Sequence, residues 1–249
     1  MMSIPARLLL ALAALLLSAT VRADVGSFLA EVVAAHGGGE TPVAIHERGS
    51  TESTRRGIGP VERWWQAPDR FRIEIRYAGA PESRLMRGAE AWQQGQPAPK
   101  EFHGAVELQA ARMALPWRLR DNAGQVRDLG ALPLGNGKQV HSLEWRVRDG
   151  LRMIIEIDPE TRLIMRSRGI LTINNSSMEF ATGYENYQTV SGGRRIAKTE
   201  RHFAMGQYIG STTLESVEFP AVLPAPTFDP PPAALRAAAS GREPARPGS

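Results

Sequence analysis

The chain has 249 residues and no cysteine, carries a formal net charge of +4, and is 42% hydrophobic and 22% charged. The absence of cysteine excludes a disulfide framework, a lipid-bearing cysteine, a thiolate zinc site and a cysteine nucleophile. The small positive charge, with no block of five or more Lys and Arg residues, argues against a nucleic-acid partner.

The first 23 residues have the pattern of a secretory signal peptide. Arg7 precedes an apolar run over residues 8–17, and Val21-Arg22-Ala23 forms a small-x-small cleavage pattern. This run is too short to cross a bilayer, and no other run reaches the roughly 18 apolar residues that a span needs. We therefore predict cleavage near Ala23 and a periplasmic mature chain without a transmembrane span. Loss of Arg7 and Arg22 lowers the net charge from +4 to +2.

The first predicted element after the leader is an amphipathic helix. Asp24 is a suitable N-cap, and the glycines over residues 37–39 end the helical pattern. A second helix is predicted over residues 105–115, before Pro116, and the Gly-, Asp- and Asn-rich residues 121–137 are predicted to form a loop. The apolar positions of the first helix, at helical spacing, are Val25, Phe28, Leu29, Val32 and Val33.

Between and after these helices the hydrophobic period is two, which indicates half-buried strands. Turn signals such as Asp149-Gly150 separate the strands and indicate hairpins. The predicted strands span residues 43–54, 61–66, 70–77, 83–88, 90–94, 139–148, 151–157, 163–172, 177–188, 195–204 and 208–218.

The strand faces predict the shape of the fold. Phe71, Ile73 and Ile75 share one face of a strand, and arginines occupy the other, which is the pattern of an antiparallel sheet with one wet face. A sheet this wide must curl or close, and two helices cannot fill a full barrel of that size. We predict a mainly β fold over residues 24–229, a single curved, incomplete antiparallel β-barrel of about 10–11 strands with two or so α-helices covering the concave face.

Two features are left open or outside this domain. Trp64 and Trp65 are neighbours on opposite strand faces, so one of them points inward, and the sequence does not say which. The Pro- and Ala-rich residues 230–249 are predicted to be a disordered tail.

Motifs for catalysis are incomplete in this sequence. The stretch His36-Gly37-Gly38-Gly39 imitates the oxyanion loop of lipases, but no G-x-S-x-G nucleophile elbow accompanies it. His46-Glu47 begins an H-E-x-x-H motif, but Ser50 stands where the second histidine should be. The five histidines have no metal-ligand spacing. We therefore predict no enzyme activity, no cofactor and no metal site.

One block of the sequence has a recognisable pattern. It contains Ala67-Pro68-Asp69-Arg70-Phe71-Arg72 after Gly57, then the step Gly88-Ala89-Glu90-Ala91-Trp92. With the leader, a helix that ends in Gly-Gly and a Phe…Pro ending, it resembles the LolA/LolB-like family of outer-membrane lipoprotein-sorting proteins over roughly residues 24–231. The resemblance implies a half-open barrel with a helical lid, acyl chains in an apolar cavity, and no catalysis or cofactor. Ala67 stands where the family has an arginine that helps to control the lid, so that role is not transferred.

The predicted function is that of a periplasmic binding or carrier protein, a monomer, which holds an acyl chain, a lipid or a lipid-modified protein. It would serve lipoprotein or lipid trafficking to the outer membrane. The residues predicted to line the apolar cavity are Phe71, Ile73, Ile75, Tyr77, Leu85, Trp92, Leu143, Trp145, Val147, Met153 and Ile155.

Two alternatives remain open at the level of sequence. A non-catalytic regulatory or scaffold domain would use the same fold to bind an envelope protein, and it would show an exposed apolar patch outside the sheet. An enzyme acting on envelope lipid or glycan would need acid and base groups that converge inside the cavity. His141 is the first candidate for such a group, because it shares a strand face with Leu143 and Trp145.

Overall fold

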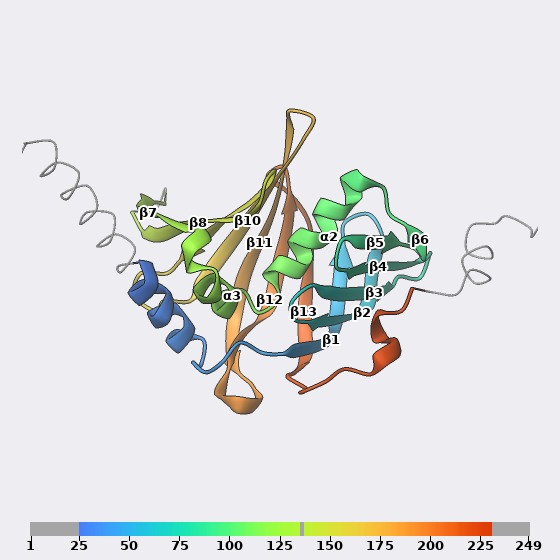
Figure 1. Ribbon diagram of the computed structural model, residues 1–249, viewed down its shortest axis with the longest axis horizontal. Helices are drawn as coiled ribbons and strands as arrows, with labels where there is room; N and C mark the ends of the chain where they lie inside the picture. The colour runs from blue at the N-terminus through green and yellow to red at the C-terminus, as the bar shows by residue number, and fades with distance from the viewer. Residues whose placement is uncertain (1–24, 135–136, 231–249) are drawn as a thin grey trace, which may run out of the picture.

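The computed structural model describes residues 25–134 and 137–230, so the predicted signal peptide and nearly all of the predicted tail lie outside the described residues. One 13-stranded sheet dominates the fold, in the order β6-β5-β4-β3-β2-β1-β13-β12-β11-β10-β9-β8-β7. All neighbouring strands are antiparallel, and β1 pairs with β13, which joins the two ends of the domain. The sheet curls without closing, so the predicted incomplete barrel is confirmed (Figure 1).

The strands alternate in burial as the period of two predicts. Where two strands pair, directly opposed residues share a face, so each apolar row continues across the sheet. The strands are β1 (Ala44–Ser53), β2 (Gly57–Gln66), β3 (Arg70–Arg76), β4 (Pro81–Arg87), β5 (Glu90–Gln93), β6 (Gln96–Pro97), β7 (Val126–Pro133), β8 (Gln139–Arg148), β9 (Leu151–Ile157), β10 (Ile164–Ile173), β11 (Ser176–Thr189), β12 (Arg195–Ala204) and β13 (Gln207–Glu218).

Two strands were not among the roughly 10–11 strands predicted from the sequence, and both lie at the edges of the sheet. Strand β6 has only two residues, and β7 occupies part of the predicted loop over residues 121–137. Gly and Asp have low β propensity, and the ladder of β7 is interrupted by a bulge between Asp128 and Gly130. Because β8 offers a free edge of backbone groups, β7 pairs with it despite this composition.

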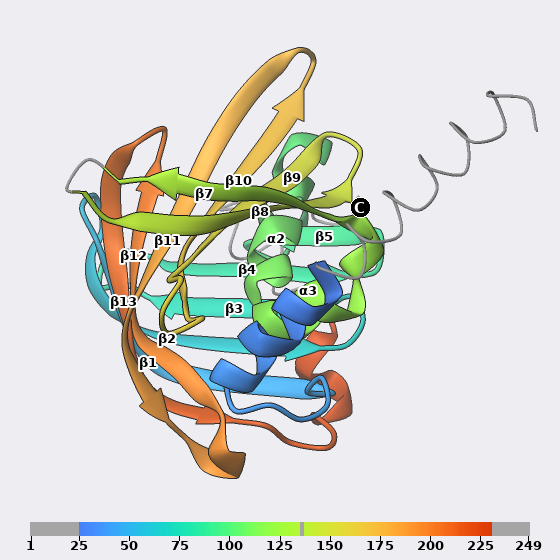
Figure 2. The same ribbon diagram turned by 90° about the vertical axis from the view of Figure 1, so that its left-hand side faces the viewer.

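Helices lie on the concave side of the sheet (Figure 2). The N-terminal helix spans residues 25–35, as predicted. The second predicted helix begins earlier than expected, as α2 (Lys100–Arg112), and is followed by α3 (Leu115–Asp121). Pro116 lies in the first turn of α3, where its missing N–H has no helical partner to lose, so the predicted break separates two helices. No helix in the described ranges is long and apolar enough to span a bilayer.

The glycines after the N-terminal helix have a structural task. Gly37, Gly38 and Gly39 all have positive φ, and a Cβ on Gly37 would lie 2.3 Å from the carbonyl oxygen of Gly193. The carbonyl oxygen of Gly38 accepts a hydrogen bond of 2.9 Å from Trp117 Nε1. These contacts fix the helix end against α3, as expected for a helix stop.

The buried apolar side chains form three clusters. The first joins β1–β3 and β13 to α2 and α3, and the second joins β8–β10 to the N-terminal helix and the other face of the helical layer. The third lies on the convex side, where the chain after β13 and the short 3₁₀ helix η3 (Ala225–Phe228) cover β1–β5. Trp65 belongs to the first cluster and is 1% exposed, whereas Trp64 packs against the third and stacks on His46, which settles the open question.

Candidate binding cavity

A cavity of about 830 Å³ lies between the concave face of the sheet and helix α2. Its lining comes from β1–β4, from α2 and the start of α3, and from β10–β13. The volume falls within the range of about 300–1,000 Å³ that small-molecule sites occupy. The helices therefore do not fill the half-barrel completely.

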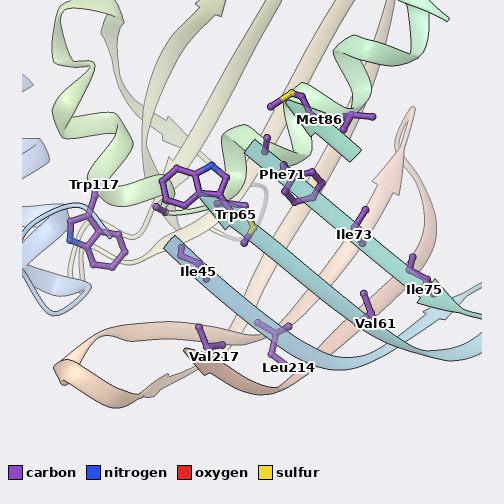
Figure 3. Close-up of a cluster of buried hydrophobic side chains, with 14 of the residues drawn as sticks. Ile45, Val61, Trp65, Phe71, Ile73, Ile75, Met86, Trp117, Leu214 and Val217 are labelled. Atoms are coloured by element: carbon purple, nitrogen blue, oxygen red, sulfur yellow. The ribbon is translucent and has the colours of Figure 1, made fainter. Parts of the chain in front are cut away.

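One wall of this cavity is apolar. Opposed residues of β1, β2 and β3, among them Ile45, Trp65 and Phe71, share the concave face because their strands pair in that register (Figure 3). Phe102 and Met113 face them from the α2 side. The apolar residues of β1–β3 and β13 that line the cavity are Ile45, Val61, Phe71, Ile73, Ile75, Ile209 and Val217, with Tyr77 directly after β3.

The structure divides the eleven predicted lining residues into three groups. Four of them line the cavity: Phe71, Ile73, Ile75 and Tyr77. The five from β8 and β9 also face the helical layer, but the N-terminal helix, α2 and α3 cover them, so they pack in the second core cluster. That group consists of Leu143, Trp145, Val147, Met153 and Ile155.

The remaining two, Leu85 and Trp92, lie on the convex face under the C-terminal segment. Strand pairing explains this placement, because Phe71 is opposite Met86 and Ile73 is opposite Arg84. Met86, Arg84 and Glu82 therefore face the concave side, and Leu85 faces away. The prediction placed Leu85 on the concave face because its side chain is apolar. That prediction was wrong because the C-terminal segment covers the convex face, so apolar side chains are buried there too.

A cluster of charged residues interrupts the apolar wall on β1 and β2 and continues to β12, and these residues were not among the predicted site residues. Arg63 Nη1 and Nη2 donate to the two carboxylate oxygens of Glu200 at 2.8 and 3.1 Å, and Arg63 Nε lies 2.7 Å from Glu47 Oε2. All three residues line the cavity. The alternation of strand faces could have placed two of these residues in the cavity, since Glu47 shares a face with Ile45, and Arg63 shares a face with Val61 and Trp65. Glu200 lies on β12, and only the order of strands in the sheet brings β12 near Arg63.

Burial and charge act in opposite directions on the two carboxyl groups. Burial raises the pKa of Glu47, and the nearby Arg63 only partly offsets it. Burial also opposes ionisation of Glu200, but the two-point contact with Arg63 lowers its pKa. Glu200 is therefore the ionised partner of Arg63, and Glu47 is the carboxyl group that more readily keeps its proton.

Two neutral histidines also line the cavity. Burial is the main cause that lowers the pKa of both His36 and His202 to about 4. His36 Nδ1 lies 2.8 Å from the carbonyl oxygen of Val32. Thr212 Oγ1 donates to Thr51 Oγ1 at 3.1 Å, so His202 Nε2, at 2.9 Å from Thr212 Oγ1, is the donor of that pair.

These histidines predict a pH dependence of stability. Between pH 6.5 and about 4 the unfolded chain binds protons at both positions and the folded chain does not. The stability that the two neutral histidines contribute is therefore complete above pH 6.5. On acidification below that pH the free energy of unfolding should fall, with a slope that approaches about 1.4 kcal/mol per pH unit for each histidine. Glu47 acts in the opposite sense, since its raised pKa makes the folded state bind the proton more tightly.

Urea denaturation across this pH range measures that slope. The double substitution His36→Gln and His202→Gln should flatten the profile relative to wild type. An equally steep profile in the double variant would assign the acid sensitivity to other groups.

The candidate residues for catalysis or metal binding do not converge in the cavity. His141 Nε2 lies 2.8 Å from Asp128 and its ring packs 4.1 Å from that of Phe28, and it is not among the described residues that line the cavity. No cluster of three or more His, Asp or Glu side chains suited to a metal ion occurs in the described ranges.

Comparison with known proteins identifies the fold. No family model and no curated protein matches the sequence. A LolA superfamily protein from Nitrosomonas europaea is 11% identical, with 80% of this chain and 95% of that chain covered and a TM-score of 0.53. A DUF1329 family protein from Desulfovibrio piger is 8% identical, with 86% and 99% covered and a TM-score of 0.50. A putative outer-membrane lipoprotein-sorting protein domain from Vibrio parahaemolyticus is 10% identical, with 86% and 99% covered and a TM-score of 0.47. The resemblance stated from the sequence is thus confirmed for the fold.

Proposed function

We propose that this protein is a periplasmic binding protein that shelters an acyl chain, or the acyl part of a lipid-modified protein, in its cavity. The observation that carries the proposal is the apolar wall of β1–β3, which faces a space of about 830 Å³ where an ordinary core would be closed. The half-open fold, which it shares with a LolA superfamily structure, supports the same role. Export would follow cleavage near Ala23, and no catalytic step is part of the proposal.

The binding energy would come from apolar burial. Removal of apolar surface from water contributes about 25 cal/mol per Å². One acyl chain contributes about 0.8 kcal/mol for each buried CH₂ group, so a long chain gains several kcal/mol. That amount suits a carrier, because the chain stays bound in transit and can still be released.

The direct test is the content of the protein as it leaves its host. The exported protein is purified without detergent, extracted with organic solvent, and the extract is analysed by mass spectrometry. About one lipid per protein is expected. A protein that is empty and also fails to bind a neutral fluorescent probe of apolar sites would refute the proposal.

A charge placed in the apolar wall should weaken binding. Ile75 is 7% exposed, lines the cavity and lies opposite Glu82 on β4. In Ile75→Glu a carboxylate would replace apolar surface that the chain contacts, so probe affinity should fall at least about tenfold, the equivalent of 1.4 kcal/mol. Fluorescence titration measures it, with circular dichroism to confirm folding. The control is Val222→Glu, the same kind of change at a side chain that is 72% exposed, and equal loss in both variants would contradict the assignment of the wall.

An exposed apolar edge favours a second candidate function, the binding of an envelope protein. The turn between β1 and β2 lies against the first residues of β13, which follow the β12–β13 turn, since Thr54 N donates to the carbonyl oxygen of Ile209 at 3.1 Å. Ile58 is 68% exposed there and Met205 63%. If this edge binds a protein partner, the double substitution Ile58→Glu and Met205→Glu should abolish co-purification of that partner from periplasmic extract and leave probe binding intact.

A further inference from the structure

Arg112, on the last turn of α2, is a cation in the cavity wall with no carboxylate partner. Its Nε donates to Ser167 Oγ at 3.1 Å, and its Nη2 donates to the carbonyl oxygen of Phe180 at 2.6 Å. Among the described residues, no carboxylate oxygen lies within 4.0 Å of its guanidinium, and Nη1 has no hydrogen-bond partner. Arg112 is half-buried and lines the cavity, so its free donor is accessible from that space.

The nearby carboxylates cannot neutralise Arg112 because Arg63 already binds them. Both oxygens of Glu200 accept hydrogen bonds from Arg63, and Glu47 Oε2 lies against Arg63 Nε. One arginine thus has two carboxylates and the other has none. An arginine inside a protein without a counter-ion is costly, which makes the arrangement unusual for a site that only serves packing.

A second positive excess lies on β4, at the same end as the β1–β2 hairpin. Arg56 Nη1 donates to Glu82 Oε2 at 2.7 Å, and Arg84 contacts the other oxygen of the same carboxylate. Arg84 Nε is buried and has no hydrogen-bond partner. Two arginines therefore share one glutamate. In total the described lining contains six arginines and four glutamates.

The cations and the apolar surface adjoin one another. Leu108 and Arg112 are four residues apart on α2 and both line the cavity, so they occupy one face of the helix. Met113 follows Arg112 and also lines it. An amphiphile with an acid group at one end could thus reach Arg112 and lay its chain along the apolar wall at the same time.

We propose that the cavity selects anionic amphiphiles, with the acid group of the ligand paired to Arg112 and its chain held by the apolar wall. This inference rests on the proposed function and names its ligand class. A carboxylate or phosphate oxygen would accept from the free Nη1 of Arg112 and complete the charge balance of the wall. Charge-assisted hydrogen bonds of this kind are about twice as strong as neutral ones.

Competition on the wild-type protein tests the charge preference. Dodecanoate, dodecyl phosphate and dodecanol carry the same chain, and each is titrated against the neutral probe N-phenylnaphthylamine bound to the protein. The two acids should displace the probe at concentrations at least about tenfold lower than the concentration of the alcohol that is needed. Acetate and inorganic phosphate should not displace it, because they lack the chain.

Each outcome decides one claim. Equal displacement by acids and alcohol would overturn the anion preference and leave the proposed function intact. Displacement by acetate or inorganic phosphate at the concentrations of the long-chain acids would show a simple anion site and overturn the claim that the ligand is an amphiphile. A protein that carries no lipid and does not bind the probe at all would overturn both proposals.

The variant Arg112→Gln assigns the preference to one residue. It should bring dodecanoate to the level of dodecanol and leave dodecanol unchanged. Arg146→Gln, at a side chain 75% exposed on β8, is the control and should behave as wild type. If Arg112→Gln weakens all three competitors equally, Arg112 only supports the wall through Ser167 and Phe180, and the inference fails. If Arg112→Gln does not fold, Arg112→Met is measured in its place, with the same expected result and the same result that would overturn the inference.

Discussion

Replacement of Arg63 by methionine is expected to destabilise the protein by about 3–5 kcal/mol, as for other buried ion pairs that lose one partner. Arg63 is the cation between Glu47 and Glu200, and the side chains of all three are 10–13% exposed. Without it two carboxyl groups would face each other in a poorly solvated wall, and at least one would have to take up a proton. Urea denaturation at neutral pH gives the free energy of unfolding.

Two further variants separate the charge effect from the loss of packing. The triple variant Arg63→Met, Glu47→Gln and Glu200→Gln should recover much of the loss, because no uncompensated charge remains. Arg48→Met removes an arginine that is 51% exposed and pairs with Glu62, so it should change stability by no more than about 1 kcal/mol. A triple variant no more stable than Arg63→Met would mean that packing around the guanidinium dominates.

The substitution Gly49→Ala is expected to destabilise the protein by about 3 kcal/mol, at the upper end for overpacking. Gly49 lies at the bulge where β1 pairs with β13, the seam that joins the two ends of the domain. A Cβ there would lie 2.1 Å from the carbonyl oxygen of Thr213 and 2.9 Å from the Cα atom of Leu214. Both are backbone atoms of a paired strand, so relief requires the two strands to separate. Thermal or urea unfolding measures the effect.

Gly183→Ala is the matched control in the same sheet. Gly183 lies on β11, and the nearest atom to its added Cβ is the carbonyl oxygen of Met165 at 4.0 Å. This variant should stay within about 0.5 kcal/mol of wild type. If the two alanine variants are equally stable, the seam adjusts more easily than its backbone contacts indicate.

Part of the candidate site was predictable from the periodicity of a single strand. The strand over residues 70–77 pairs with its sequence neighbours, and its alternation of apolar and charged residues placed Phe71, Ile73 and Ile75 on one side. That side is the concave one and faces the cavity. Local periodicity was sufficient here because a strand has only two faces and only one of them was apolar.

Periodicity failed where both faces of a strand are covered. Leu85 packs under the C-terminal segment, so its apolar side chain says nothing about the cavity. On β8 and β9 the inward parity of residues such as Trp145 and Met153 was sound, but parity does not tell whether helix or empty space lies opposite. That depends on where α2 and α3 pack, which is decided by contacts between segments far apart in the chain.

The sequence by itself determined a mainly β chain with one helix before the sheet and helical sequence in its middle, two strand faces of opposite character, and hairpins between most strands. These are local properties, set by periods of 2 and 3.6 residues and by turn-forming residues. Only the tertiary structure decided that β1 and β13 meet, and so that Glu200 reaches Arg63 while Arg112 has no carboxylate partner in the described part of the chain. Such pairings depend on strand order and on the competition of buried charges for few partners, and neither can be predicted from a short stretch of sequence.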